Sequence, residues 1–306
     1  TSNWNGIEVK AASNVTVTGN KANNNFDFGI KFEQSTNSIV SKNNANNNGW
    51  AGIGIFTTQN SVVNANIVKN NINYGIDLVY SYYNIVTANS VTNRVVSYNE
   101  RIASIVLYYS SFNLIYHNNF NNYYLFEYVN ITNTWDNGME GNYWQFYRSG
   151  ESWIRYSSID ANQDGIGDTP YIINATRYTN QDRYPLMGKF SIFKMPQEYY
   201  ITTISNLSIS NFRFNQTSEI LSFSTTNENE TGFCRIRVPK ALVGDTYWVL
   251  VNNRMPLTLK VLPYSNSTYE YIYLTYAQGN ILESLIVPIF QSPGILPLRF
   301  FFWQIQ

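Results

Sequence analysis

Residues 29–52 read GIKFEQSTNSIVSKNNANNNGWAG, and residues 52–75 read GIGIFTTQNSVVNANIVKNNINYG. Both segments begin with Gly-Ile, and this glycine recurs every 23 residues at Gly6, Gly29, Gly52 and Gly75. A fifth copy begins at Ser104-Ile105, after one spacing of 29 residues. Repetition at one spacing is typical of a solenoid, in which each copy forms one coil.

Apolar residues recur in four columns of the repeat. Two columns lie two residues apart, which is the spacing of a short strand with one buried face. The other two predict two further strands, so three strands and short turns fill each coil. A single coil cannot bury its inner face, so neighbouring coils must stack on a shared core. The sequence therefore predicts a right-handed parallel β-helix over residues 1–134. The columns are Ile7, Ile30, Ile53, Ile76 and Ile105; Val9, Phe32, Ile55, Leu78 and Leu107; Val17, Val40, Val63, Val86 and Ile115; and Ala22, Ala45, Val68, Val91 and Phe120.

Asparagine recurs in two further columns. Asparagine tolerates φ > 0 in turns, and stacked amides hydrogen-bond from coil to coil. We therefore expect a structural role for these side chains. They are Asn14, Asn37 and Asn60, with Asn84 and Asn113 one place later, and Asn20, Asn43, Asn66, Asn89 and Asn118.

The outward columns carry charge. Glu8 lies one coil from Lys31 and Lys10 one coil from Glu33, which predicts a checkerboard of opposite charges. Asp77 shares a column with Glu8 but lies three coils away, about 14 Å, which is too far for one bond-breaking site. The six extra residues of the fourth copy, within residues 93–103, predict a loop that carries Arg94, Glu100 and Arg101.

Aromatic residues rim the coils. Such a stripe could stack on sugar rings, contact another subunit or simply cover a face of the helix. The residues that we consider for glycan or subunit contact are Trp4, Trp50, Tyr74, Tyr80, Tyr82, Tyr83, Tyr108 and Tyr109.

The Gly-Ile…Asn repeats resemble the parallel β-helix repeats of the NosD-like family. Residues 135–144, 160–171 and 182–187 resemble the segment that closes such helices in archaeal surface proteins, so we assign residues 135–189 to a closing segment. NosD itself is associated with copper delivery to nitrous oxide reductase. This chain has one His, His117, one Cys and four Met without a ligand cluster, so the copper role is not carried over. His117 occupies a turn column and is expected at the surface.

The closing segment contains an acidic loop. Asp160, Asn162 and Asp164, followed by Gly165, fit the first half of a calcium loop. Ile166 would add its carbonyl and Asp168 a further oxygen, but Tyr171 stands where an EF-hand has Glu. The loop predicts a structural calcium ion, completed by a remote carboxylate such as Asp182. The alternative is a cluster of Asx-turns without metal.

Alternating strands replace the repeat in residues 190–280, which predicts an immunoglobulin-like β-sandwich. The apolar residues 281–306 weakly resemble an archaeal sorting tail, and contact with a membrane is expected only through this tail, subject to processing. The expected strands are residues 206–214, 220–224, 234–238, 247–251, 257–262 and 269–276.

Composition bounds the function. Twenty Lys and Arg balance twenty Asp and Glu, which argues against nucleic acid as a partner. Cys234, in phase with apolar neighbours, is expected to be a buried thiol.

No leader is visible, and numbering is expected to start at a mature or truncated N-terminus. Seven sequons predict glycosylation and an extracellular or cell-surface location: Asn14, Asn130, Asn174, Asn206, Asn215, Asn229 and Asn266.

Three functions are compared. We expect a non-enzymatic structural or adhesive surface protein, acting as a homo-oligomer or polymer in a filament or surface layer, because the first coil and the apolar tail both need to be covered. A carbohydrate-binding module that uses the aromatic stripe is the alternative. A glycan lyase or hydrolase would need two carboxylates about 5–10 Å apart, and no columns supply them.

Overall fold

The computed structural model describes residues 3–93, 103–121, 125–127, 132–149, 152–155, 158–174, 180–227, 231–244, 246–276 and 279–288. The chain divides into two compact units. The first comprises Thr1–Ile192, Thr202–Asn206 and Phe233–Arg235, and the second comprises Phe193–Ile201, Leu207–Gly232 and Ile236–Gln306.

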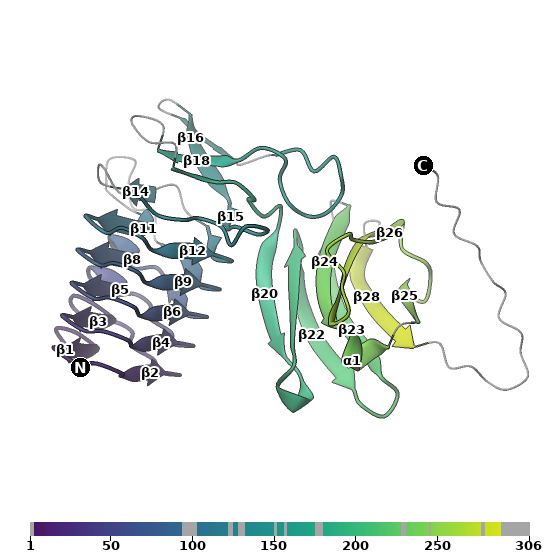
Figure 1. The fold of residues 1–306 in the computed structure, drawn as a ribbon, viewed down its shortest axis with the longest axis horizontal. Coiled ribbons are helices and arrows are strands. Elements are labelled where there is room, and N and C mark those ends of the chain that lie inside the picture. The colour runs from purple at the N-terminus through teal and green to yellow at the C-terminus, as the bar shows by residue number, and fades with distance from the viewer. Residues whose placement is uncertain are drawn as a thin grey trace, which may run out of the picture. The chain divides into compact units, whose positions relative to one another are not determined.

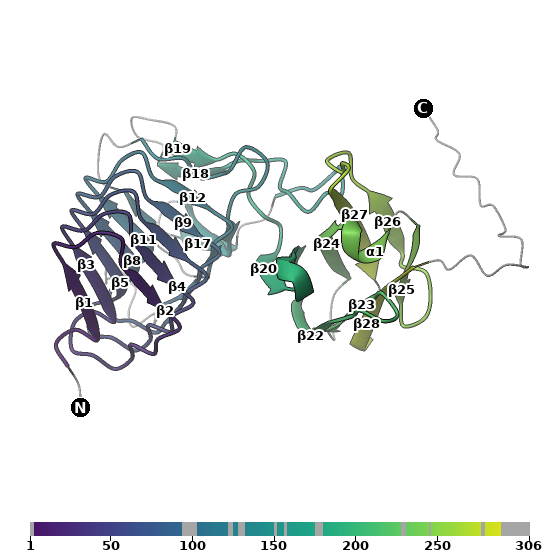
Figure 2. The ribbon, with the colours of Figure 1, turned by 60° about the horizontal axis from the view of Figure 1, so that its bottom comes forward.

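Three parallel sheets form the first unit (Figures 1 and 2). The first sheet contains β1 (Ile7–Lys10), β3 (Ile30–Glu33), β5 (Ala51–Phe56), β8 (Tyr74–Val79), β11 (Ala103–Tyr108) and β14 (Leu125–Glu127). The second contains β2 (Thr16–Thr18), β4 (Ile39–Ser41), β6 (Val62–Asn64), β9 (Ile85–Thr87) and β12 (Leu114–Tyr116). The third contains β7 (Ile67–Lys69), β10 (Ser90–Thr92), β13 (Asn119–Phe120) and β15 (Tyr143–Trp144).

The register of the first sheet follows the repeat. Ile30 pairs with Ile53, and Ile53 pairs with Ile76. Ile76 pairs with Ile105, so the 29-residue spacing leaves the ladder in register. The expected loop with Arg94, Glu100 and Arg101 lies outside the described residues. The four apolar columns meet in one core, where most side chains have no exposed area, and the predicted β-helix of about five coils is confirmed.

Asparagine ladders run along the helix inside this core. The Asn66 side chain accepts hydrogen bonds from the Asn43 backbone N–H and Nδ2, and its own Nδ2 donates to Asn89 Oδ1 and to the Val40 carbonyl. The same pattern continues through Asn118 to Asn142. A second ladder, which the repeat did not predict, joins Asn25, Asn48 and Asn71.

The asparagines of the other predicted column occupy two different positions in the coil. Asn14, Asn37 and Asn60 adopt φ of 59°, 51° and 52°, as expected for the turn. In the next two coils Tyr83 and Phe112 hold this left-handed position, each with φ of 58°. Asn84 and Asn113 are instead buried, in register with Ser61, and form a third ladder in which the Asn84 backbone N–H and Nδ2 both donate to Asn113 Oδ1. All five asparagines therefore have the expected structural role, the first three in the turn and the last two in a ladder.

The last coil is closed by residues of the closing segment. Trp135 and Trp144 extend the core, and Trp144 stacks on Tyr171 at 4.4 Å. Two hairpins follow the coils: β16 (Phe146–Ser149) with β17 (Ser152–Arg155), and β18 (Tyr171–Asn174) with β19 (Asn180–Asp182).

Two sheets form from residue 189 onward, in the orders β20-β21-β24-β27-β26 and β22-β23-β28-β25. All six expected strands are present. Those at residues 247–251 and 269–276 match at both ends, and the other four differ at one or both ends. The immunoglobulin-like assignment and the four-part division of the chain stay predictions. The boundary at residue 280 is too early, because β28 pairs with both β23 and β25. The elements are β20 (Lys189–Lys194), η1 (Pro196–Glu198), β21 (Tyr200–Ser205), β22 (Ser208–Asn215), β23 (Ile220–Asn227), β24 (Gly232–Pro239), α1 (Lys240–Val243), β25 (Tyr247–Val251), β26 (Thr258–Val261), β27 (Tyr269–Tyr276) and β28 (Gly279–Pro288).

Candidate functional site

A groove of about 750 Å³ lies on the outer face of the first sheet. Side chains alternate between the two faces of a strand, so the residues between the core columns point outward. The outward column at the floor contains Lys31, Gly54, Asp77 and Val106 in consecutive coils. The next outward column contains Glu33, Phe56, Val79 and Tyr108.

Gly54 shapes the floor of the groove. A Cβ atom at this position would lie 2.6 Å from Phe56 Cε2 and 2.8 Å from Phe28 Cδ1. The two rings therefore lie over the glycine, where they pack edge to face with centroids 5.4 Å apart. Any larger residue at position 54 would displace them.

Aromatic side chains from three coils form the walls. Trp50 and Tyr74 pack edge to face on one side, with centroids 5.7 Å apart. Tyr80 packs edge to face on Tyr108 at 5.9 Å on the other side, and it stacks flat on Tyr109 at 5.3 Å. Trp50 and Tyr80 are 42% and 47% exposed, so part of each side chain is accessible to a ligand.

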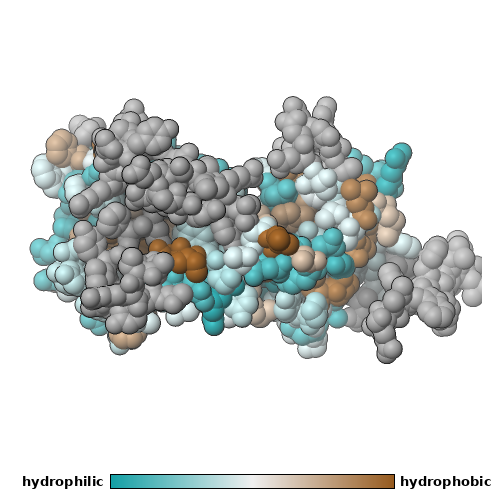
Figure 3. Space-filling view, turned by 90° about the horizontal axis from the view of Figure 1, so that it is seen from above, coloured by the Kyte–Doolittle hydropathy of each residue, from teal (hydrophilic) through white to brown (hydrophobic). Residues whose placement is uncertain are grey.

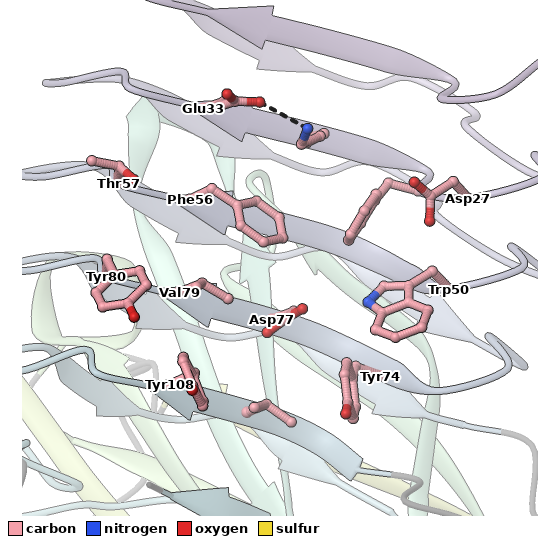
Figure 4. Close-up of a pocket in the computed structure, with 13 residues that line it drawn as sticks. Asp27, Glu33, Trp50, Phe56, Thr57, Tyr74, Asp77, Val79, Tyr80 and Tyr108 are labelled. Atoms are coloured by element: carbon pink, nitrogen blue, oxygen red, sulfur yellow. Dashed lines mark hydrogen bonds and ion pairs between the residues drawn. The ribbon is translucent and has the colours of Figure 1, made fainter.

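Asp77 lies at the centre of the groove. Figure 4 shows its carboxylate between Phe56, Trp50 and Tyr108. Its neighbours cover it until only 4% of the residue is exposed. Burial raises the pKa of Asp77 to about 7, although the Trp50 side chain hydrogen-bonds to the carboxylate and lowers the pKa. Asp77 is therefore near the midpoint of its titration at neutral pH.

The other charged groups of the groove lie two coils away from Asp77. Lys31 Nζ contacts Glu33 at 2.8 Å and Glu8 at 3.5 Å, and it lies 5.5 Å from the centroid of the Phe56 ring. Glu33 also contacts Lys10 at 3.0 Å, so the predicted charge checkerboard is confirmed. The hydrogen bonds from Lys31 and Lys10 lower the pKa of Glu33, whereas burial raises that of Asp27.

A second hollow of about 590 Å³ shares Asp27 and Trp50 with the groove. Trp4 stacks on Phe26 there, with centroids 5.0 Å apart. On the face shown in Figure 3, hydrophilic residues cover much of the described surface and hydrophobic residues form small patches.

The structure separates the predicted aromatic stripe into groups. Trp50, Tyr74, Tyr80 and Tyr108 line the groove, and Tyr109 stacks on Tyr80 next to it. Trp4 lines the second hollow. Tyr82 and Tyr83 line neither, and Tyr83 stacks on Phe112 at 5.2 Å in the next turn of the coil.

The acidic loop is held by its own backbone. Asp160 accepts hydrogen bonds from the backbone N–H groups of Asp164 and Gly165, each at 2.9 Å. Asp164 accepts from the Ile166 N–H, and Asp168 accepts from the Ala161 N–H. Among the described residues, no group of three or more His, Cys, Asp and Glu side chains is placed to hold a metal ion. The geometry favours the Asx-turn alternative, while calcium binding through Asp160, Asn162, Asp164, Ile166 and Asp168 stays a prediction.

Asp182, the expected remote ligand, is engaged elsewhere. It is fully buried and accepts hydrogen bonds from the Asn142 N–H at 2.7 Å and from Trp144 Nε1 at 2.8 Å. It thus holds the end of the β-helix rather than completing the acidic loop.

His117 was wrongly expected at the surface. Its Nε2 lies 2.6 Å from Glu140, its ring stacks on Phe190 at 4.0 Å, and its side chain is only 13% exposed. Glu140 also contacts Arg235, which is 2% exposed, at 2.6 Å. The buried thiol expected at Cys234 is confirmed, and burial raises its pKa.

The sequons differ in accessibility. Asn14, Asn206, Asn215 and Asn266 are exposed. Asn130 and Asn229 lie outside the described residues, as does the side chain of Asn174, which is in β18. Glycosylation stays a prediction.

Residues 1–120 match the family model of the right-handed beta helix region. Similar solved structures include the Dettilon tailspike protein, which is 14% identical over 89% of this chain and 56% of that chain, with a TM-score of 0.31. The enzymatically active domain of tailspike protein 2 from bacteriophage CBA120 is 12% identical over 94% of this chain and 56% of that chain, with a TM-score of 0.35. The chain thus spans just over half the length of these structures, and at such TM-scores the matches identify no function. No curated protein matches the chain.

Proposed function

We propose that the protein binds carbohydrate in the groove around Asp77 and acts as an extracellular adhesive protein that does not cleave its ligand. The observation that carries the proposal is the combination of two accessible aromatic walls with one central carboxylate. Ligand sites are typically concave and mostly apolar, with a few convergent polar groups, and have volumes of roughly 300–1,000 Å³.

Sugar rings suit this arrangement. A pyranose has an apolar face of C–H groups that packs on a flat aromatic ring, and hydroxyl groups at its rim that hydrogen-bond to a carboxylate. Trp50 and Tyr80, which are both partly exposed, lie on opposite sides of Asp77. The groove therefore offers stacking surfaces and a polar group to one glycan chain.

Cleavage is less well supported than binding. Glycosidases place two carboxylates roughly 5–10 Å apart. The other two acids of the groove, Asp27 and Glu33, lie two coils from Asp77, which is about 10 Å along the helix axis before any lateral offset. The separation of these carboxylates from Asp77 is thus at or beyond the upper end of the range found in glycosidases, which favours a binding protein over an enzyme.

Location and assembly belong to the same proposal. The exposed sequons agree with an extracellular protein, and no helix among the described residues is long and apolar enough to cross a membrane. The predicted homo-oligomer, filament and surface layer stay predictions, because residues 289–306 of the apolar tail lie outside the described residues.

A glycan array with matched tyrosine variants tests the proposal. We expect the wild-type protein to bind a subset of oligosaccharides and Tyr80→Ala to weaken that binding about fivefold, because a stacked aromatic contact contributes about 1 kcal/mol. Tyr83→Ala is the control, since Tyr83 is 55% exposed and stacks on Phe112 much as Tyr80 stacks on Tyr109, but outside the groove.

The control variant should bind like wild type. Equal losses in both variants, or no binding of any oligosaccharide by the wild type, would refute the proposal. Release of reducing ends from a bound oligosaccharide, abolished by Asp77→Asn, would show that the groove is catalytic.

A further inference from the structure

Asp77 has no cationic partner among the described residues. The Trp50 side chain hydrogen-bonds to it, and no basic side chain of the described chain pairs with it. Its column neighbours, Gly54 and Val106, are a glycine and an apolar residue. A buried carboxylate normally has a counter-charge, because removing an ionised group from water is costly.

Among the described residues that line the groove, Lys31 has the only ammonium group, and it is already engaged. Lys31 contacts Glu33 and Glu8, and both bonds raise its pKa. Asp27 adds a further carboxylate to the lining. The groove therefore has more acids than bases, and an anionic glycan, such as one built of uronic acids, would be repelled.

Aromatic rings surround Asp77. Trp50, Phe56 and Tyr108 lie around its carboxylate in Figure 4, together with Tyr74. Aromatic faces carry negative potential, and cages of such rings recognise ammonium and methylated ammonium groups, with greater strength where water is excluded. A carboxylate at the base of an aromatic cage fits a cation better than it fits a neutral hydroxyl.

Resting on the carbohydrate-binding function proposed above, we infer that the groove selects glycans that carry a positively charged amino group, with the cation seated between the aromatic rings against the Asp77 carboxylate.

Binding of a cation should depend on pH in one direction. The pKa of Asp77 is raised to about 7, so the carboxylate that attracts the cation is present above this pH and is protonated below it. The charged and titratable groups that line the same groove are Asp27, Lys31, Glu33, Tyr74, Tyr80 and Tyr108. Burial also raises the pKa of Asp27, whose protonation acts in the same direction. Affinity for a permanently charged ligand should therefore fall about tenfold from pH 8 to pH 6.

Two hexasaccharides on the same sugar backbone test the inference by calorimetry with the full chain. One carries N,N,N-trimethylglucosamine, which is cationic at every pH, and the other carries N-acetylglucosamine, which is neutral. At pH 8 we expect the cationic hexasaccharide to bind at least tenfold more tightly, and this preference to shrink at pH 6.

The Asp77→Asn variant removes the charge and keeps the size of the side chain. We expect it to reduce the preference below about threefold. The preference is the ratio of the two affinities, so a loss of affinity common to both hexasaccharides leaves it unchanged. Glu198→Gln, which removes an exposed acid outside the groove, should keep the full preference. Thermal unfolding of each variant checks that it is folded.

The outcomes separate the inference from the proposed function. Equal binding of the two hexasaccharides at pH 8, no binding of the cationic one, or a preference that survives in Asp77→Asn overturns the inference. A neutral or acidic oligosaccharide that binds on the array and loses affinity in Tyr80→Ala would still support carbohydrate binding.

Discussion

At the scale of single residues, the asparagine ladders stabilise the coils most specifically. Asn66 is 1% exposed and uses its oxygen as a double acceptor and its nitrogen as a double donor. Asn66 thereby satisfies the carbonyl of Val40 in β4 and the backbone N–H of Asn43 in the neighbouring coil, and these groups would otherwise be buried without partners.

A single-atom change in this ladder should be costly. Asn66→Asp replaces the donor nitrogen with an oxygen that faces the Val40 carbonyl and Asn89 Oδ1. We expect the free energy of unfolding at pH 7 to fall by at least about 2–3 kcal/mol, because buried acceptors lose their donor and a charge is buried. Urea unfolding measures this change.

Asn70→Asp is the matched control for Asn66→Asp. Asn70 is exposed in the next turn of the same coil, with φ of 55°, which aspartate also tolerates. Its unfolding midpoint should match that of wild type, and a similar loss in both variants would contradict a ladder-specific role.

The repeat predicted the ladder of Asn66 but not the burial of Asp77. An asparagine that recurs in five coils leaves a periodic signal, whereas Asp77 occurs once in its column. Its environment depends on Gly54 in the previous coil and on side-chain directions of Trp50 and Phe56 that spacing does not specify. The sequence signal that could have predicted this groove was a glycine and an acidic residue in consecutive coils, between two columns of aromatic residues. His117 was misread for the same reason, because Glu140 and Phe190 come from outside the repeat.

At the scale of elements, the acidic loop has the sequence motif of a calcium site, but its hydrogen bonds favour a loop without metal. Both Asp160 carboxylate oxygens accept hydrogen bonds from backbone N–H groups. The Asp164 carbonyl accepts a hydrogen bond from Arg235 at 2.9 Å. The loop thus has internal donors where a calcium loop would have a cation. We expect the thermal unfolding midpoint to be the same with calcium at about 1 mM and with a chelator in place of calcium. The reason is that the ion would have to displace these hydrogen bonds.

Asp160→Ala should lower the midpoint in both conditions alike, since it removes two hydrogen bonds of the loop. A midpoint that rises by several degrees in calcium for wild type but not for Asp160→Ala would instead confirm the calcium prediction.

At the scale of the whole molecule, periodicity determined how far the fold could be predicted. In the coils of the first unit, apolar residues recur at the same inward positions, so strand positions and register follow from alignment alone. In the second unit strands such as β23 and β28 pair without any repeat to align them. Alternation there predicts strands but not their partners, which is why β28 was assigned to a tail.

The pH dependence of stability is also a property of the whole molecule, because two buried carboxylates act together. Burial raises the pKa of both Asp77 and Asp182 to about 7, from an ordinary value of 3.8. Between these values the folded protein holds protons that the unfolded chain releases, so stability should fall as pH rises from 5 to 7. Each group contributes up to about 2–3 kcal/mol over that interval, since one pKa unit corresponds to about 1.4 kcal/mol.

Below pH 4 the trend should reverse. Burial opposes ionisation of Asp136, but the hydrogen bonds from Arg183 outweigh it and lower the pKa of Asp136, so its contribution is lost as it becomes protonated. Urea midpoints should therefore peak near pH 4–5 rather than at neutral pH. Asp77→Asn should remove about half of the slope between pH 5 and 7 and make the protein more stable than wild type at pH 8. A wild-type curve that is flat over this interval, or an unchanged slope in the variant, would show that Asp77 titrates near its ordinary value.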